Sequence, residues 1–223
     1  MQAETIDKHA TPNPLAHHFE NLEQQREAGT LGMWIFIVTE IMFFGGLFTV
    51  YLVYRNWYPD AFTAASHELD LTLGSINTLV LIGSSLTMAM AVYSIQTGSN
   101  KFTILFLVLT LLLGLVFLGI KSMEYYHKFE EGHIPGSHFT FPEPYRQHAQ
   151  VFFALYFGMT GLHALHMIVG IGILAVLIFM TWRKRFSPAY HAPIELSGLY
   201  WHFVDIIWIF LLPLLYLIGR HLH

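Results

Sequence analysis

Five long hydrophobic runs divide the chain, and each is long enough to cross a lipid bilayer as a single helix. At a rise of about 1.5 Å per residue, a hydrocarbon layer of about 30 Å needs about 20 apolar residues. The hydrophobic runs cover residues 31–53, 71–95, 102–120, 151–182 and 198–219. This pattern predicts an all-α, polytopic membrane protein, built as a bundle of five transmembrane helices.

The polar stretches outside these runs are short, so we expect one membrane domain, residues 31–223. Residues 1–30 carry prolines, histidines and alternating charges around no apolar core, which argues against a cleavable signal peptide. We expect this part of the chain to form a polar segment on the cytoplasmic side.

Charged residues follow the third hydrophobic run at helical spacing. Lys121, Glu124 and Lys128 fall on successive turns, and Glu124 and Lys128 have the favourable i,i+4 order of an ion pair. We expect the third helix to continue through them as a charged rim. Gly132 and Pro135 predict where this helix ends.

Composition agrees with a membrane protein and excludes several kinds of centre. The chain is 54% hydrophobic and 12% charged, which leaves little polar surface for a soluble domain. The absence of cysteine excludes disulfides, thiolate-held iron-sulfur clusters and covalent haem attachment within this chain. The net charge of -4 gives no indication of nucleic-acid binding, and no nucleic acid is expected as a partner.

Basic residues at the ends of the runs predict the orientation. Five spans place the two termini on opposite sides, and Lys and Arg are almost evenly divided between the sides. The compact basic cluster at residues 183–185 directly follows the fourth run. Because basic residues favour the cytoplasmic side, we expect the N-terminus inside and the C-terminus outside.

A carboxyl group lies within the first hydrophobic run. Glu40 follows Leu31 by nine residues, which is about 14 Å into the membrane at about 1.5 Å per residue. A charged side chain at this depth is costly unless a basic partner or several donors hold it. We expect Glu40 to be functional, as a proton site or a polar contact, and a purely structural hydrogen bond is the alternative.

The fourth run contains two histidines. His163 and His166 lie three residues apart on one helix face, where they cannot readily ligate one haem from opposite sides. We expect them to form hydrogen bonds between helices that approach closely at Gly158, Gly161 and Gly170. Haem or metal ligation is the alternative to this structural role.

The fifth run contains a second polar pair. His202 and Asp205 share one helix face, and a neutral imidazole that donates to the carboxylate would satisfy both groups. We expect a structural pair, because a proton relay needs further groups that reach water and this helix provides none. Asn77 in the second run is expected to have a similar, lesser role.

Two Glu-x-x-His patterns raise the question of a di-iron centre. They join Glu124 to His127 and Glu130 to His133. Di-iron bundles take one such motif from each of two facing helices, together with further glutamates. Both patterns here lie on a single stretch of chain, so we expect no metal.

Four segments in sequence order carry a resemblance to a known family. They are Val38–Phe44 around Glu40, the triplet Glu124-Tyr125-Tyr126, Thr160–Gly170 around the two histidines, and Trp201–Trp208. The chain resembles the cytochrome c oxidase subunit III family of the haem-copper terminal oxidases. The aromatic residues that belong to these motifs are Tyr125, Tyr126, Trp201 and Trp208.

The resemblance implies a subunit without a redox centre of its own. In that family the haems and copper lie in a partner, catalytic subunit I, and the complex reduces oxygen to water and translocates protons. The glutamate that matches Glu40 is the carbodiimide-reactive carboxyl of the family, and subunit III supports proton uptake. The family also binds phospholipid. The partners implied are therefore subunit I, other oxidase subunits and membrane lipids, in a bacterial inner membrane.

The chain departs from the seven-helix mitochondrial form of that family. Two N-terminal helices that form one wall of its lipid cleft have no counterpart here, so another subunit forms that wall or lipid is held differently. The resemblance favours the cytochrome c oxidase type, and quinol is the other electron donor to consider. The alternatives are a quinol-handling di-haem membrane anchor and a nitric-oxide-reductase-associated member of the same family.

Overall fold

The computed structural model describes residues 15, 18–136 and 139–217, and helices account for most of this part of the chain. The long helices are α1 (Leu22–Trp57), α3 (Leu71–Gln96), α4 (Asn100–Glu130), α5 (Arg146–Trp182) and α6 (Ala192–Leu212). A short helix, α2 (Pro59–His67), connects α1 to α3, and α6 continues into a π-helical turn, η1 (Pro213–Leu217).

Five of these elements are long and apolar enough to cross a membrane: α1, α3, α4, α5, and α6 together with η1. The predicted five-helix fold class is therefore confirmed. The first helix starts earlier than hydrophobicity indicates, at Leu22, because the side chain of Asn21 accepts a hydrogen bond from the Gln24 N–H and caps it. Residues 1–14 and 16–17 of the predicted polar segment lie outside the described residues.

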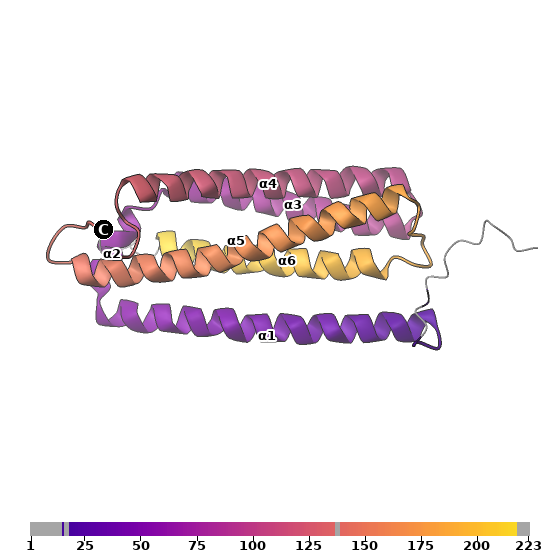
Figure 1. The fold of residues 1–223 in the computed structure, drawn as a ribbon, viewed down its shortest axis with the longest axis horizontal. Coiled ribbons are helices and arrows are strands. Elements are labelled where there is room, and N and C mark those ends of the chain that lie inside the picture. Colours follow the sequence, from indigo (N-terminus) through magenta and orange to yellow (C-terminus); the bar gives the residue numbers. More distant parts are fainter. Residues whose placement is uncertain (1–14, 16–17, 137–138, 218–223) are drawn as a thin grey trace, which may run out of the picture.

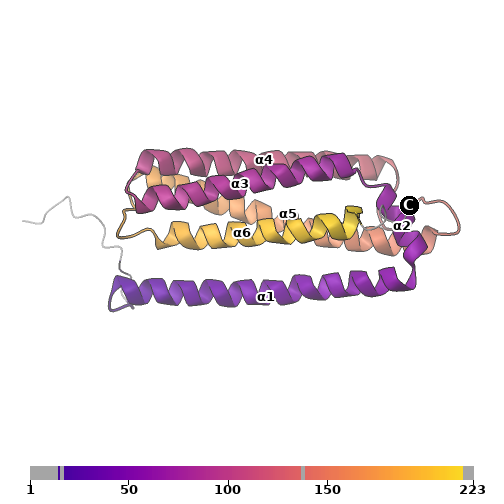
Figure 2. The same ribbon diagram turned by 180° about the vertical axis from the view of Figure 1, so that it is seen from behind.

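The helices lie side by side in one elongated bundle (Figure 1). Helices α3, α4, α5 and α6 pack together, whereas α1 runs along one side of this group, against α6 and α5 (Figures 1 and 2). Helix α2 lies at the end of the bundle where α1 finishes and packs against α5. Helix α1 begins at the opposite end from η1, as five crossings require.

Capping residues and a glycine define helix ends. Asp70 begins α3 by accepting hydrogen bonds from the N–H groups of Thr72 and Leu73. Helix α4 ends at Glu130, and Gly132 follows with a φ of +73°. The structure thus ends this helix where the sequence predicts, because glycine adopts positive φ without the steric cost that a side chain brings.

Trp201 of α6 connects four helices at the centre of the bundle. Its ring lies between Gly114 of α4 and Gly170 of α5, and a Cβ atom at either glycine would stand 2.9 Å from the ring. The indole N–H donates to Ser84 Oγ of α3 at 3.1 Å. Gly170 is therefore a point of close approach, whereas a Cβ atom at Gly158 would meet nothing within 4 Å.

Candidate functional site

Polar side chains gather at three places between the helices, and each place contains residues that the sequence analysis selects. The first joins α1 to α5 at Glu40 and His166. The second joins α4, α5 and η1 around Glu124. The third lies between α3 and α6 at His202 and Asp205.

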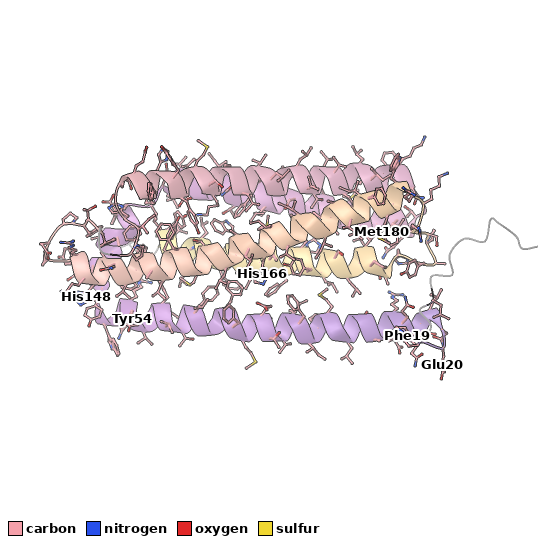
Figure 3. The ribbon with its side chains drawn as sticks, in the orientation of Figure 1. Phe19, Glu20, Tyr54, His148, His166 and Met180 are labelled. Atoms are coloured by element: carbon pink, nitrogen blue, oxygen red, sulfur yellow. The ribbon has the colours of Figure 1, made fainter. Side chains whose placement is uncertain are left out.

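Glu40 faces His166 across the interface of α1 and α5. Glu40 Oε2 lies 3.4 Å from His166 Nε2, and the two side chains are 20% and 16% exposed. Figure 3 shows His166 on the side of α5 that faces α1. The other ring nitrogen, Nδ1, lies 2.9 Å from the backbone carbonyl of Leu162. The carboxyl group of Glu40 therefore has a basic partner close to the middle of the bundle.

The Leu162 carbonyl determines how protons are arranged in this pair. Because a carbonyl oxygen only accepts, His166 Nδ1 carries a hydrogen and donates it there. If the imidazole is neutral, Nε2 is an acceptor, and only a protonated Glu40 carboxyl can donate to it. If the imidazole is charged, the carboxylate is ionised and accepts. In either form, Nε2 is the ring nitrogen available to the Glu40 carboxyl group.

Glu124 is the centre of a buried polar cluster. Lys121 Nζ donates to Glu124 Oε2 at 2.9 Å, and the Tyr156 hydroxyl of α5 donates to Oε1 at 2.7 Å. The Tyr216 hydroxyl of η1 also donates to Oε1 and accepts from Lys121 at 2.8 Å. Lys121 and Glu124 are only 4% and 3% exposed. The cluster thus fastens η1 to α4 and α5.

The predicted charged rim is wrong. Lys121, Glu124 and Lys128 are all buried, because α4 turns this face towards the rest of the bundle. The predicted ion pair between Glu124 and Lys128 does not form, since Lys128 pairs with Glu131 instead. Lys121 Nζ also lies 4.6 Å from the centre of the Trp208 ring, a cation-π contact that extends the cluster to α6.

His163 and Asn77 form hydrogen bonds between helices. His163 is 1% exposed, and its Nε2 donates to the Val204 carbonyl of α6 at 3.1 Å. Asn77 is fully buried on α3 and donates to the Phe117 carbonyl of α4 at 3.5 Å. His163 therefore joins α5 to α6, and Asn77 joins α3 to α4.

His202 and Asp205 do not pair with each other. His202 Nδ1 lies 2.7 Å from the Ser85 hydroxyl of α3. Asp205 is 3% exposed, and neither of its carboxylate oxygens has a hydrogen-bond partner among the described residues. The predicted pair is therefore corrected: the spacing puts both side chains on one side of α6, but the imidazole binds the neighbouring helix instead.

The motif aromatics have different surroundings. The Trp208 indole N–H donates to Thr78 Oγ1 of α3 at 3.1 Å. The Tyr125 hydroxyl lies 2.5 Å from Thr160 Oγ1 of α5. Tyr126 is 60% exposed on the outer side of α4. Trp208 and Tyr125 therefore hold helices together, whereas Tyr126 lies on the outer surface of the bundle.

A family model described as "Cytochrome c oxidase subunit III" matches residues 16–220 of the chain. The chain belongs to the cytochrome c oxidase subunit III family. A Staphylococcus aureus protein described as "Probable quinol oxidase subunit 3" is 33% identical over 198 residues, which are 86% of this chain and 90% of that protein. A Bacillus spizizenii protein described as "Quinol oxidase subunit 3" is 32% identical over 202 residues, 89% of this chain and 92% of that protein.

Family membership makes this chain a subunit III of a haem-copper oxidase complex, with haem and copper in other subunits. The predicted family is confirmed. The three intramembrane histidines of this subunit III each face protein groups: His163 a carbonyl, His166 a carbonyl and a carboxyl, and His202 a hydroxyl. Within the described residues, no three His, Cys, Asp or Glu side chains are placed to hold a metal ion.

Four residues that complete these polar groups of subunit III are not identified as partners by the sequence pattern. Lys121 belongs to the predicted charged rim, and its spacing of three residues from Glu124 indicates that the two share a face. Tyr156, Tyr216 and Ser85 come from helices distant in sequence, so only the packing of the bundle brings them to Glu124 and His202.

Proposed function

We propose that this chain is the non-redox subunit III of a quinol-oxidising haem-copper terminal oxidase, which reduces oxygen to water and translocates protons. The observation that carries the choice of donor is the description of both relatives as quinol oxidase subunit 3, matched over nine tenths of their length. The cytochrome c oxidase type is the second candidate, and the description of the family favours it.

In this proposal, the chain supports catalytic subunit I in the inner membrane of a bacterium, with its N-terminal end in the cytoplasm. Two observations support this placement. The relatives come from bacteria. The basic cluster at residues 183–185 follows α5 at the end of the bundle where α1 begins, and such clusters favour the cytoplasmic side (Figure 1).

The pair formed by Glu40 and His166 is the element we assign to proton supply. It places a carboxyl group 3.4 Å from an imidazole in a partly exposed position between α1 and α5. A pocket of about 400 Å³ opens beside it, lined by His166, Tyr200 and apolar side chains. A group that exchanges one proton with its partner at small structural cost suits a subunit that helps its neighbour to take up protons.

Bound phospholipid is a further part of the proposal. A groove of about 490 Å³ lies between α1 and α6, and its lining includes Trp34, Ile37, Phe44, Phe203 and Phe210. These side chains offer an apolar surface that fits acyl chains. Lipid in this groove would fill the space between α1 and the rest of the bundle.

The test of the proposed function is oxygen consumption by the complex purified from its native membrane through a tag on this chain. Quinol and reduced cytochrome c are supplied separately as electron donors. We expect oxygen uptake with quinol and none above background with cytochrome c. Uptake with cytochrome c alone would establish the second candidate, and a complex without oxidase subunits would contradict the proposal.

A further inference from the structure

Asp205 is the buried carboxyl group that the rest of the described chain leaves unsatisfied. It is 3% exposed, and neither Oδ1 nor Oδ2 has a hydrogen-bond partner among the described residues. The Ser85 hydroxyl lies near it and 2.7 Å from His202 Nδ1, and its single hydrogen can serve at most one of the two carboxyl oxygens. Buried carboxyl groups are costly without partners, so the free acceptors of Asp205 call for a donor from outside the chain.

Asp205 lies beside a groove that opens on the outer side of the bundle. This α3/α6 groove has a volume of about 450 Å³, and its lining includes Ser85, Leu86, Ala89, Asp205, Ile206 and Ile209. Leu86, Ile206 and Ile209 are 65%, 49% and 47% exposed, so the groove is open at the outer surface of the subunit. Figure 2 shows α3 and α6 side by side along this face.

The depth of Asp205 excludes water and lipid headgroups as its natural partners. It stands 13 residues after Ala192 and 12 residues before Leu217, the two ends of the fifth span. At about 1.5 Å per residue it is about 20 Å from either end, in the middle of a hydrocarbon layer of about 30 Å. Acyl chains carry no hydrogen-bond donor, so lipid in the α3/α6 groove would leave the carboxyl unsatisfied.

Small residues on α3 also fit a helix in this position. Ser85 and Ala89 are one turn apart and both line the groove. Small side chains at this spacing let the backbone of another membrane helix approach closely. The same stretch therefore combines a shape that suits a helix with an acceptor that suits a polar side chain.

We propose that a transmembrane helix from another subunit of the oxidase packs over the α3/α6 groove and donates a hydrogen bond from a polar side chain to Asp205. The inference rests on the proposed function only for the source of the helix, a partner subunit. It assigns the two grooves beside α6 to different occupants: acyl chains against α1, and a protein helix against α3.

Photo-crosslinking within the intact oxidase tests this inference. The probe is p-benzoylphenylalanine at Leu86, which lines the α3/α6 groove but not the groove against α1, in the complex in its native membrane, with adducts identified by mass spectrometry. We expect an adduct with another oxidase subunit. Adducts with lipid alone would overturn the proposal.

Two further variants in the same background identify the contact. Asp205→Leu removes the acceptor, so we expect roughly tenfold less protein adduct, whereas Asp205→Asn keeps an acceptor and most of the adduct. Because Asp205 makes no hydrogen bond within the described chain, Asp205→Leu should not lower the helix content of the detergent-solubilised subunit. A full adduct yield in Asp205→Leu would contradict the contact.

Ala89→Leu is a second variant that tests the same contact if Asp205→Leu fails to fold. Ala89 is exposed on α3, so a larger side chain obstructs an incoming helix without disturbing the interior. We expect it to lower the adduct yield as well, and an unchanged yield would contradict the proposed position of the helix.

The failure of this inference is distinguishable from the failure of the proposed function. If the complex oxidises cytochrome c and the protein adduct forms, quinol is wrong as the electron donor and the helix contact is retained. If the complex oxidises quinol and no protein adduct forms, only the helix contact is wrong.

Discussion

Glu40 lies opposite His166 at the interface of α1 and α5. The separation of 3.4 Å between Oε2 and Nε2 brings them together, and the Leu162 carbonyl commits the other ring nitrogen to donation. A carboxyl group near the middle of the first span thereby has a basic side chain within 3.4 Å. This arrangement is the physical basis for assigning the pair to proton supply.

Replacing Glu40 by glutamine removes the exchangeable proton and keeps the shape of the side chain. In Glu40→Gln the amide donates to His166 Nε2, so we expect normal assembly and a several-fold shorter turnover lifetime of the oxidase. The number of turnovers before activity decays is the measurement. Thr39→Val is the control, because Thr39 is exposed and bonds only its own helix at Phe36. An unchanged turnover lifetime in Glu40→Gln would show that Glu40 has only a structural role.

Gly170 is expected to tolerate no side chain. A Cβ atom there would stand 2.9 Å from the ring of Trp201, which Gly114 confines on its other side. Gly170→Ala should therefore lower the free energy of unfolding by about 1 to 3 kcal/mol. Thermal unfolding in detergent measures this. Gly158→Ala, on the same helix with open space around it, should show no loss, and equal behaviour of the two variants would contradict the packing of Trp201.

Lys121 is expected to stabilise the cluster around Glu124. Lys121→Met leaves a buried carboxyl without its cation, and breaking a buried ion pair in this way costs about 3 to 5 kcal/mol. The double variant Lys121→Met with Glu124→Gln should recover much of this loss, since no charge is then stranded. Lys101→Met is the matched control, because Lys101 is exposed at the first turn of α4. Equal unfolding temperatures for Lys121→Met and Lys101→Met would argue that the cluster contributes nothing.

The loop after α4 contains titratable groups that lie beyond the hydrophobic spans. Burial lowers the pKa of His133, the Lys128 charge lowers it further, and Glu131 and Glu68 oppose this only in part. Burial acts to raise the pKa of Glu131, but its hydrogen bond and ion pair with Lys128, together with His133, outweigh burial and leave this pKa below its usual range. His133 also stacks on Phe153, with ring centres 4.9 Å apart.

Both groups make the loop less stable as pH falls. A histidine with a lowered pKa contributes stability that is present above its ordinary pKa of about 6.5 and is lost as pH falls towards the lower folded value. We expect the protection of residues 131–136 from hydrogen exchange, corrected for the intrinsic rate at each pH, to decrease as pH falls from about 7 to about 5. His133→Phe keeps the stacking and should reduce this pH dependence, whereas His127→Phe, at an exposed position, should not. Identical profiles for the two variants would exclude His133 as the cause.

The five membrane helices were predictable because each contains an apolar run that is long enough to cross a bilayer. Helix α2 was not, since its nine residues mix proline, aspartate and small side chains. It is ordered by tertiary contacts instead: Phe62 packs edge-on against Phe152 of α5, with ring centres 5.5 Å apart. Short helices of this kind depend on neighbours that a local pattern does not reveal.

Polar residues within the spans were predictable as sites, but their partners were not. Glu40 and His163 stand out because an apolar run has no other reason to contain them. The hydrogen bond from His202 goes to Ser85, which is 117 positions away, and not to Asp205 on the same helix. Helical spacing decides which side chains share a face, whereas packing between helices decides what each one meets.

The central claim is that this chain is a non-redox subunit III beside a catalytic partner. Its most direct test is the optical spectrum of the tagged complex before and after this chain is stripped away with a stronger detergent, with mass spectrometry of both fractions. We expect haem bands to remain with a separate oxidase subunit and the stripped chain to have no Soret absorbance. Haem that follows this chain would contradict the account.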